Sequence, residues 1–457
     1  MKKSFSLFSI IFIAFIAQFC SAPQKETGNR ELDIKNKISN SLENDILKYW
    51  YPRVIDTVDG GYISRYTYDW KEDSVQDKFL VFETRHIWTT AQLYEFMPER
   101  KEFLQYSKHG YEFLRDYMWD VEYGGFYIAV DKKGKPMPGL IDGKTVYGQA
   151  FSLYGLAKYF IVSGDSGALD LAIKEFLWME NGPHDPEYGG YFEVLARDGK
   201  PITEYKPGNR SDRNSQFNIG FKDFNSSIHL LEALSTLYEA WPDPLVKERL
   251  EEMLVIVRDK MIVPGDYLLQ YFYPDLQRVS GEVLKNRTGN EHWLGEPITF
   301  GHDIETAFLL LEAAESLGWE ESTVMPVCER LVEHTIKFGW DHANGGIFDD
   351  GSHVTPDSVI IIRNSKSWWA EVESLNTLLL MSKKVPEKKD EYFNLFLKQW
   401  EYIDTYVIDH THGEVFSHGT DTRPDTKLQP KAHGWKASYH TVRALVNCLK
   451  MLEESPE

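Results

Sequence analysis

The sequence predicts an all-α fold, an (α/α)6 barrel in which six helix pairs close into a ring. One observation is a turn motif, an aspartate followed by glycines and an aromatic or branched residue, which recurs along the 457 residues. The motif occurs at Asp59, Asp120, Asp185, Asp341 and Asp409, with a degenerate copy near Asp266. The other is that two helical patterns of apolar residues lie between successive motifs. A repeat that cannot bury its apolar face alone gains a core by packing on its neighbours, so six units predict one closed barrel.

Each unit is a helix pair plus a short β-hairpin or turn. The first helix of a pair is apolar around more of its circumference than the second, so we expect the first to be inner and the second outer. The predicted inner helices cover residues 82–96, 147–160, 223–240, 301–318, 367–381 and 439–452. The amphipathic segment 32–50 would be the outer partner of the last inner helix and would close the ring. We therefore assign residues 32–453 to one barrel domain, with the aperiodic segment 196–218 as a loop over one mouth.

The N-terminus has the layout of an export signal. Lys2 and Lys3 precede an apolar run that is shorter than the roughly 20 residues of a membrane span. Cys20 and the polar residues after it are typical of a bacterial lipoprotein, although cleavage after Ala22 is an alternative. We therefore expect residues 1–20 to be a signal peptide with Cys20 lipidated, and residues 21–31 to be a polar tether. The protein would be exported, either periplasmic or held at the membrane by its lipid alone.

Composition narrows the ligand class. A formal net charge of −20 argues against nucleic acid, which is bound by basic surfaces. Aromatic residues make up 14% of the chain, with 13 tryptophans. Their flat apolar faces suit the C–H faces of sugars, so the composition favours a small-molecule carbohydrate ligand.

Polar and aromatic residues recur at the starts of the predicted inner helices. His302 and Glu305 are three residues apart and therefore share a helix face. Taken alone, this pair is explained by a well-capped helix. The same register is occupied in the other units, which predicts one concave ligand site. The candidate residues are Arg85, Tyr147, Asn225, His229, His302, Glu305, Trp368, Trp369, Glu371, Glu373, Trp435 and His440.

These residue types favour proton transfer over metal chemistry. Neither His-x3-His nor Glu-x-x-His appears where a metal site would need it, so no metal is expected. Two histidines on opposite sides of a carbon can remove a proton from one face and return one to the other. Arg85 would stabilise the enediolate charge. A glycoside hydrolase would instead need two carboxylates, which Glu305 with Glu371 or Glu373 could supply.

Six motifs in order resemble the N-acylglucosamine 2-epimerase superfamily, most closely its cellobiose (mannobiose) 2-epimerase branch. They are FETRHIWTTAQLY, YGQAFSLYGLAKY, FNSSIHLLEAL, FGHDIETAFLLLEA, KSWWAEVESLN and GWKASYHTVRAL. The resemblance implies a cofactor-independent isomerase that inverts C2 of a reducing-end sugar, such as that of cellobiose, between glucose and mannose configurations through a cis-enediolate.

The resemblance also implies roles for individual residues. His302 and His440 are similar to the acid/base pair, and Arg85 to the arginine that holds the enediolate. Asn225, His229 and Glu305 match residues that orient the substrate, with His229 close to the chemistry. Trp435 and one of Trp368 or Trp369 resemble the sugar-stacking platforms, and Tyr147 is a further candidate contact. Three alternatives stay open, namely an aldose–ketose isomerase of monosaccharides, an (α/α)6 glycoside hydrolase and a sugar-binding lipoprotein without catalysis.

Overall fold

The computed structural model describes residues 22–137, 143–205, 218–263, 265–289, 296–355 and 357–453, with side chains from residue 30 onward except that of residue 296. The predicted signal peptide with Cys20 lies outside the described residues, as do residues 206–217 of the predicted mouth loop. Both remain predictions. Among the described helices, none is long and apolar enough to span a bilayer.

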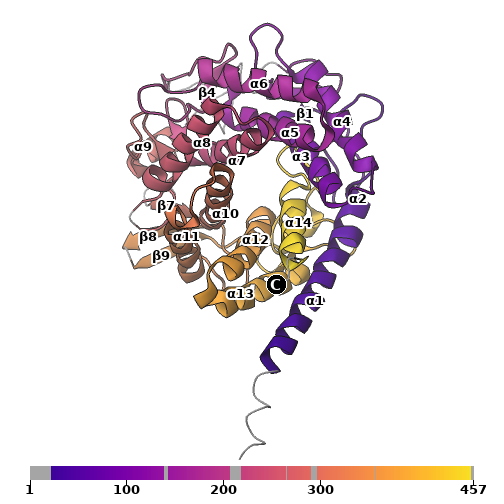
Figure 1. Cartoon of the computed structure of the whole chain (residues 1–457), viewed down its shortest axis with the longest axis vertical. Helices are drawn as coiled ribbons and strands as arrows, with labels where there is room; N and C mark the ends of the chain where they lie inside the picture. The colour runs from indigo at the N-terminus through magenta and orange to yellow at the C-terminus, as the bar shows by residue number, and fades with distance from the viewer. Residues whose placement is uncertain are drawn as a thin grey trace, which may run out of the picture.

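Six inner helices form a closed ring, as Figure 1 shows. Each packs against the next along the chain, and the last packs against the first. They are α3 (Leu80–Phe96), α5 (Val146–Ser163), α7 (Phe224–Ala240), α10 (Phe300–Leu317), α12 (Trp368–Lys384) and α14 (Tyr439–Glu453). The predicted (α/α)6 barrel is confirmed, and every predicted inner helix is an inner helix of the structure.

The outer layer holds one partner for each inner helix. Its members are α1 (Ala22–Ser41), α4 (Glu102–Phe113), α6 (Ser166–Asn181), α8 (Pro244–Ile256), α11 (Met325–Phe338) and α13 (Lys389–Tyr402). Helix α1 packs against α14 and so closes the ring as expected (Figure 1). Its backbone is helical from Ala22, so no break marks the expected boundary between a polar tether and the domain at Leu32. Pro23 is compatible with this because proline is tolerated in the first turn of a helix.

Short helical elements complete the chain. Four outer segments end in a π-helical turn, η1 (Leu42–Leu47), η2 (Leu114–Met118), η3 (Val257–Met261) and η7 (Ile403–Val407). The others are α2 (Lys48–Trp50), α9 (Gly281–Thr288), η5 (Glu321–Thr323), η6 (Pro386–Lys388) and η8 (Pro424–Leu428).

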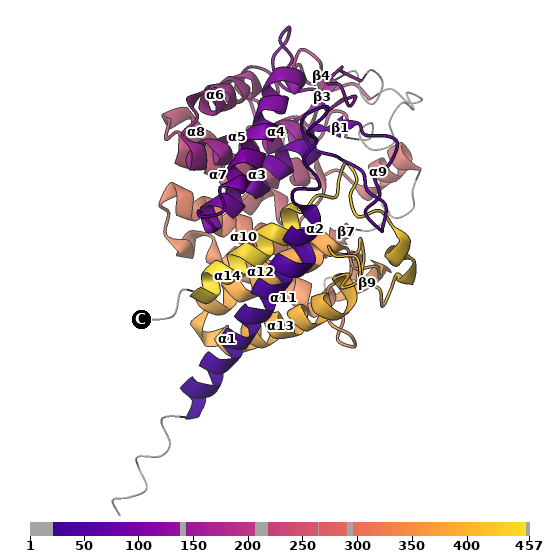
Figure 2. The same ribbon diagram turned by 90° about the vertical axis from the view of Figure 1, so that its right-hand side faces the viewer.

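The strands lie at one end of the barrel, where the inner helices begin (Figure 2). Three antiparallel pairs join β1 (Lys78–Phe79) to β2 (Ala129–Val130), β3 (Gly143–Thr145) to β4 (Val194–Ala196), and β5 (Lys222–Asp223) to β6 (Tyr271–Phe272). A three-stranded sheet orders β7 (Glu296–Thr299), β8 (Asp350–Thr355) and β9 (Ser358–Arg363). In the first three pairs, a strand leading into an inner helix pairs with one from the following unit.

A buried ion pair anchors five of the six turn motifs. The motif aspartate contacts a lysine that precedes an inner helix, and each of these lysine side chains is at most 2% exposed. The pairs are Asp56–Lys78, Asp120–Lys144, Asp185–Lys222, Asp341–Lys366 and Asp409–Lys431. The first motif therefore begins at Asp56 and not at Asp59. In the degenerate unit, Asp266 instead pairs with Arg330 at the surface.

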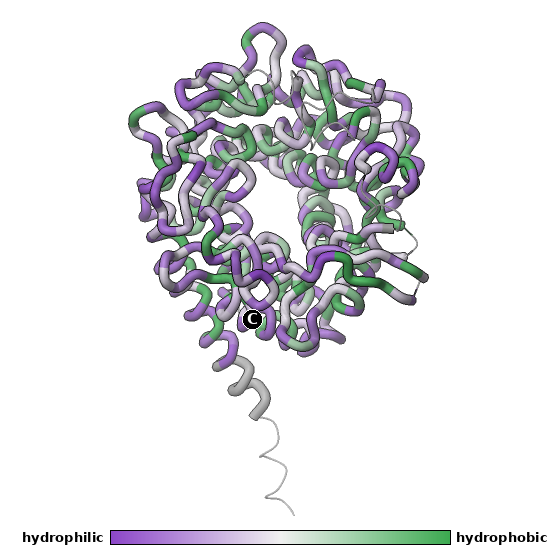
Figure 3. The backbone as a smooth tube through the Cα atoms, turned by 180° about the vertical axis from the view of Figure 1, so that it is seen from behind, coloured by the Kyte–Doolittle hydropathy of each residue, from purple (hydrophilic) through white to green (hydrophobic). Residues whose placement is uncertain are grey.

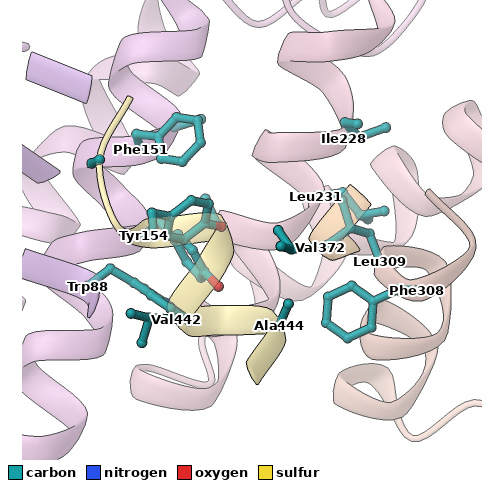
Figure 4. Close-up of a cluster of buried hydrophobic side chains, with 14 of the residues drawn as sticks. Trp88, Phe151, Tyr154, Ile228, Leu231, Phe308, Leu309, Val372, Val442 and Ala444 are labelled. Atoms are coloured by element: carbon teal, nitrogen blue, oxygen red, sulfur yellow. The ribbon is translucent and has the colours of Figure 1, made fainter. Parts of the chain in front are cut away.

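The core lies between the helices of the ring. Figure 4 shows inner-helix side chains such as Trp88, Tyr154, Leu231, Phe308 and Val442 in one cluster, and all five are buried. Seen from behind, the rim is mostly hydrophilic, whereas the helices around the centre carry hydrophobic stretches (Figure 3). This packing fixes the inner helices, so the side chains at their N-termini converge on one mouth.

Candidate active site

One cavity of about 210 Å³ is lined by ten of the twelve candidate site residues that the sequence singles out. They are Arg85, Tyr147, Asn225, His229, His302, Glu305, Trp368, Trp369, Trp435 and His440. Nine of them lie in the first two turns of inner helices, and Trp435 precedes α14 by four residues. The convergence of these residues is therefore a consequence of the ring, since all inner helices start at the same end.

His440 is held by a carboxylate. Its Nδ1 lies 2.7 Å from Glu373 Oε1, and the same oxygen accepts from Arg443. Because that oxygen acts as an acceptor, Nδ1 carries the proton and donates it, which leaves Nε2 with its lone pair. Burial, followed by the positive charges of Arg85 and Arg443, holds the pKa of His440 well below its usual range. His440 is thus neutral at neutral pH and is equipped to accept a proton.

His302 lies in a contrasting, aromatic environment. Its ring centroid is 4.5 Å from that of Trp369 and 4.8 Å from that of Phe224. Nδ1 is buried and has no hydrogen-bond partner among the described residues. Burial, and then the charge of His229, lowers the pKa of His302 to about 3. The ring of Trp369 also lies 6.0 Å from that of His440, so both imidazoles lie close to the same indole.

Arg85 reaches into the cavity from α3. It donates to the backbone oxygen of Trp435 at 2.9 Å and to the Tyr147 hydroxyl at 3.0 Å. The guanidinium also stacks over Phe151, with its carbon 4.5 Å from the ring centroid. A cation fixed in this way can stabilise an anion that forms beside it.

His229 and Asn225 extend the polar wall on α7. His229 Nδ1 is 3.1 Å from Glu232 Oε2, an i,i+3 pair like His302 and Glu305. The N-cap of α7 is Asp223, not Asn225. The buried Oδ1 of Asn225 has no partner among the described residues, so it is available to a ligand.

A buried arginine that the sequence reasoning missed joins the histidine partners. Arg443 contacts Glu232, Glu305 and Glu373, and all four side chains are at most 1% exposed. Burial alone would raise the pKa of Glu232, but Arg443 and His229 lower it to about 2. Burial raises the pKa of Glu373, while the charge of Arg443 acts in the opposite direction and favours the carboxylate.

A spacing in the sequence could have revealed this network. IHLLEAL, GHDIETA and YHTVRAL each place a charged residue three positions after a histidine, on three inner helices. In the structure these charged residues are Glu232, Glu305 and Arg443, and Arg443 forms ion pairs with both glutamates.

The three glutamates proposed for a glycoside hydrolase, Glu305, Glu371 and Glu373, do not form the free pair of carboxylates that such an enzyme needs. Glu371 accepts from the backbone nitrogen of Ile347 and from Gln399 and does not line the cavity. Glu305 and Glu373 are both bound by Arg443. The interpretation of Glu305 with Glu371 as a hydrolytic pair is therefore wrong.

Both tryptophans at the start of α12 line the cavity, although we expected only one. Trp368 is the first residue of the helix, so helical periodicity alone does not set the direction of its side chain. Its ring lies 6.5 Å from that of His433, and Lys436 Nζ lies 5.6 Å from its centroid. With Trp435, which is 52% exposed, three indoles surround the opening.

A larger cavity of about 380 Å³ adjoins the first. Tyr147, Asn225, His302 and Trp435 line both cavities. The added wall brings polar groups such as Glu193, Asp223 and Gln270 together with Phe79 and Tyr271. The two cavities together therefore have a larger volume than the active-site cavity alone.

Ligand atoms of Glu305, Glu373 and His440 lie within 4.8 Å of one another, which is close enough to hold a metal ion. The guanidinium of Arg443 already donates to both of these carboxylates. Because a fixed cation neutralises the two acids, the donor set is poorly suited to a second positive charge.

Comparison with known proteins gives one family. The model of the N-acylglucosamine 2-epimerase (GlcNAc 2-epimerase) family matches residues 61–444. Cellobiose 2-epimerase of Bacteroides fragilis is 26% identical over 439 residues, which cover 92% of this chain and 99% of the relative. D-mannose isomerase of Marinomonas mediterranea is 24% identical over 424 residues, or 89% of this chain and 95% of that relative.

Among solved structures, cellobiose 2-epimerase from Bacillus thermoamylovorans B4167 superposes with a TM-score of 0.78. The match covers 92% of this chain and 99% of the other at 24% identity. At 24% identity, the superposition supports the fold alone.

Proposed function

The chain belongs to the N-acylglucosamine 2-epimerase family, and on that premise we propose that it inverts C2 of the reducing-end sugar of a disaccharide such as cellobiose. The resemblance inferred from the six motifs is thus confirmed at the family level. The observation that carries the proposal is the pair of histidines, His302 and His440, whose rings both lie beside Trp369 in one cavity.

The reaction would follow ring opening and use the two histidines on opposite faces of C2. One imidazole removes the C2 proton, and the electrons of the C–H bond form the C1–C2 double bond while the carbonyl electrons move to O1. The other histidine, in its imidazolium form, then gives its proton to the opposite face of C2 while the electrons on O1 re-form the carbonyl. C2 is inverted, and one histidine has gained the proton that the other has lost. Glu373 makes His440 the better base, because it stabilises the imidazolium that forms.

Arg85 would stabilise the intermediate. Its guanidinium is fixed by Trp435 and Tyr147 on the cavity wall, so no reorganisation is needed when the cis-enediolate charge appears. Asn225, His229 and Glu305 would orient the sugar hydroxyls.

The adjoining cavity favours a disaccharide over a monosaccharide. A reducing-end ring beside the histidines leaves the 380 Å³ space for the second ring, and Trp435, shared by both cavities, is placed to stack on it. The second candidate is an aldose–ketose isomerase, because the same enediolate gives a ketose when the proton returns to C1.

Product analysis tests the proposal. The protein is incubated separately with cellobiose, glucose, mannose and N-acetylglucosamine, and the products are identified by NMR. We expect cellobiose to give the disaccharide with mannose at its reducing end. Accumulation of a ketose would favour the isomerase, release of glucose a hydrolase, and binding without turnover a carbohydrate-binding protein.

Trp435 gives a prediction about substrate binding. Trp435→Ala should raise KM for cellobiose about fivefold, equivalent to ~1 kcal/mol of lost stacking, with a smaller change in kcat. The backbone oxygen that accepts from Arg85 is retained in this variant. Steady-state kinetics measure both constants, and Trp319→Ala is the control because Trp319 lies outside the cavity. An unchanged KM in Trp435→Ala would show that the indole of Trp435 does not contact the sugar.

We also propose that the protein is exported and anchored by a lipid on Cys20. Lys2 and Lys3, the following apolar run and the cysteine directly after it support the proposal. In a bacterial host, the wild type should take up labelled fatty acid and sediment with membranes, and Cys20→Ser should do neither. Uptake of label by neither protein would overturn the assignment.

A further inference from the structure

A second cavity of about 190 Å³ lies at the opposite end of the barrel. It is formed by the C-terminal halves of α10, α12 and α14, on the side where α14 ends in Figure 2. On α10, Glu305 lines the active-site cavity and Glu312 lines this one. At 1.5 Å per residue, the two are about 10 Å apart along the helix. We call it the rear cavity.

Asn376 is a buried amide of the rear cavity whose hydrogen-bonding groups are unsatisfied. It is fully buried and lines the cavity, yet neither Oδ1 nor Nδ2 has a hydrogen-bond partner among the described residues. An unsatisfied buried amide is destabilising, so such groups are normally paired with protein, water or ligand. A simple cation would satisfy the oxygen alone, whereas a hydroxyl-bearing ligand can accept from Nδ2 and donate to Oδ1.

The remaining lining fits a neutral ligand of that kind. Glu312 is partly buried in the wall and offers carboxylate oxygens to hydroxyl groups. The two lysines at the rim already have partners, because Lys384 pairs with Glu321 and Lys450 with Glu95. No unpaired lysine or arginine of the described lining is therefore left to attract an anion. The other wall is apolar and consists of Phe308, Leu311, Leu380 and Met451.

We propose that the rear cavity is a second binding site, which takes a neutral polyol of the size of one monosaccharide. Its volume is close to that of the active-site cavity, about 190 against 210 Å³. Asn376 and Glu312 bind hydroxyl groups, and the apolar wall faces the carbon skeleton. Phe308 connects the site to the catalytic network, since the Arg443 guanidinium carbon lies 5.6 Å from its ring centroid. The proposal rests on this cavity alone and does not depend on the reaction at the other mouth.

Met451 lines the cavity, so its side-chain methyl resonance can report on binding there. The full-length protein is labelled with ε-¹³C-methionine and titrated with methyl β-D-glucoside, which cannot open its ring and is not turned over. We expect the Met451 resonance to shift saturably in the wild type. The shift should disappear in Asn376→Leu and persist in Trp435→Ala, which alters only the active-site mouth.

A second variant keeps the test decisive if Asn376→Leu fails to fold. Leu380→Trp fills the cavity and keeps the amide, and it should also abolish the Met451 shift. Both variants should retain epimerase activity within about twofold, because neither residue lines the active-site cavity. A Met451 resonance that does not move in the wild type, or that moves equally in both variants, would show that the rear cavity holds only water.

Discussion

Replacing His440 by alanine is expected to lower kcat for epimerisation of cellobiose by about 10²–10⁴-fold, the usual contribution of one general acid–base group. The reason is the contact between its Nδ1 and Glu373, which leaves Nε2 as the basic atom in the cavity. The unfolding free energy should change much less. Steady-state kinetics and a denaturant titration of the same preparation separate the two effects.

The two-histidine arrangement makes this prediction more specific. If His440 and His302 serve opposite faces of C2, His440→Ala should still exchange the C2 proton of one epimer with solvent, and His302→Ala that of the other. His342→Ala is the control, since His342 is exposed and does not line the cavity. Full activity in His440→Ala would remove this histidine from the mechanism.

Replacing Arg443 by methionine is expected to reduce the unfolding free energy by about 3–5 kcal/mol, because it leaves buried carboxylates without their cation. Three glutamates lose a partner at once, Glu232, Glu305 and Glu373. Activity should fall as well, since Glu373 positions His440. Chemical denaturation measures the stability. Arg330→Met, which breaks the surface pair with Asp266, should cost no more than about 1 kcal/mol.

The pH dependence of this loss has a defined sign. In the wild type the pKa of Glu232 is about 2, so it is ionised in the folded protein at pH 5 and at pH 8. Without the guanidinium, burial raises the pKa of Glu232 in the folded variant above its pKa in the unfolded chain. The variant therefore loses stability as the pH rises from the pKa of the unfolded state towards that of the folded state. The deficit of Arg443→Met should therefore be smaller at pH 5 than at pH 8. An equal deficit at both values would mean that charge burial is not its cause.

The ring and the cavity wall could be predicted because both follow from local patterns repeated along the chain. Each inner helix begins after a turn motif, so residues in the first two turns, such as Arg85 and His302, reach the same mouth. The network behind them was harder to predict. The spacing of a histidine and a charged residue on α7, α10 and α14 points to Glu232, Glu305 and Arg443, but it does not show that these side chains meet. No local pattern pairs Glu373 with His440.

Two expectations failed for reasons of local geometry. Glu371 and Glu373 are two residues apart and therefore face different directions on α12, so only Glu373 reaches the site. Trp368 lies at the very start of the same helix, where helical periodicity does not yet fix the direction of a side chain. The N-terminal signal and residues 206–217 lie outside the described structure, so they stay predictions from sequence.

Solvent exchange at C2 tests the central claim most directly. Cellobiose is incubated with the protein in deuterated water, and the C2 position of the product is followed by NMR. Proton removal and return by His302 and His440 predicts product with mannose at the reducing end and deuterium at C2. An epimerised product that retains its original hydrogen at C2 would contradict the account.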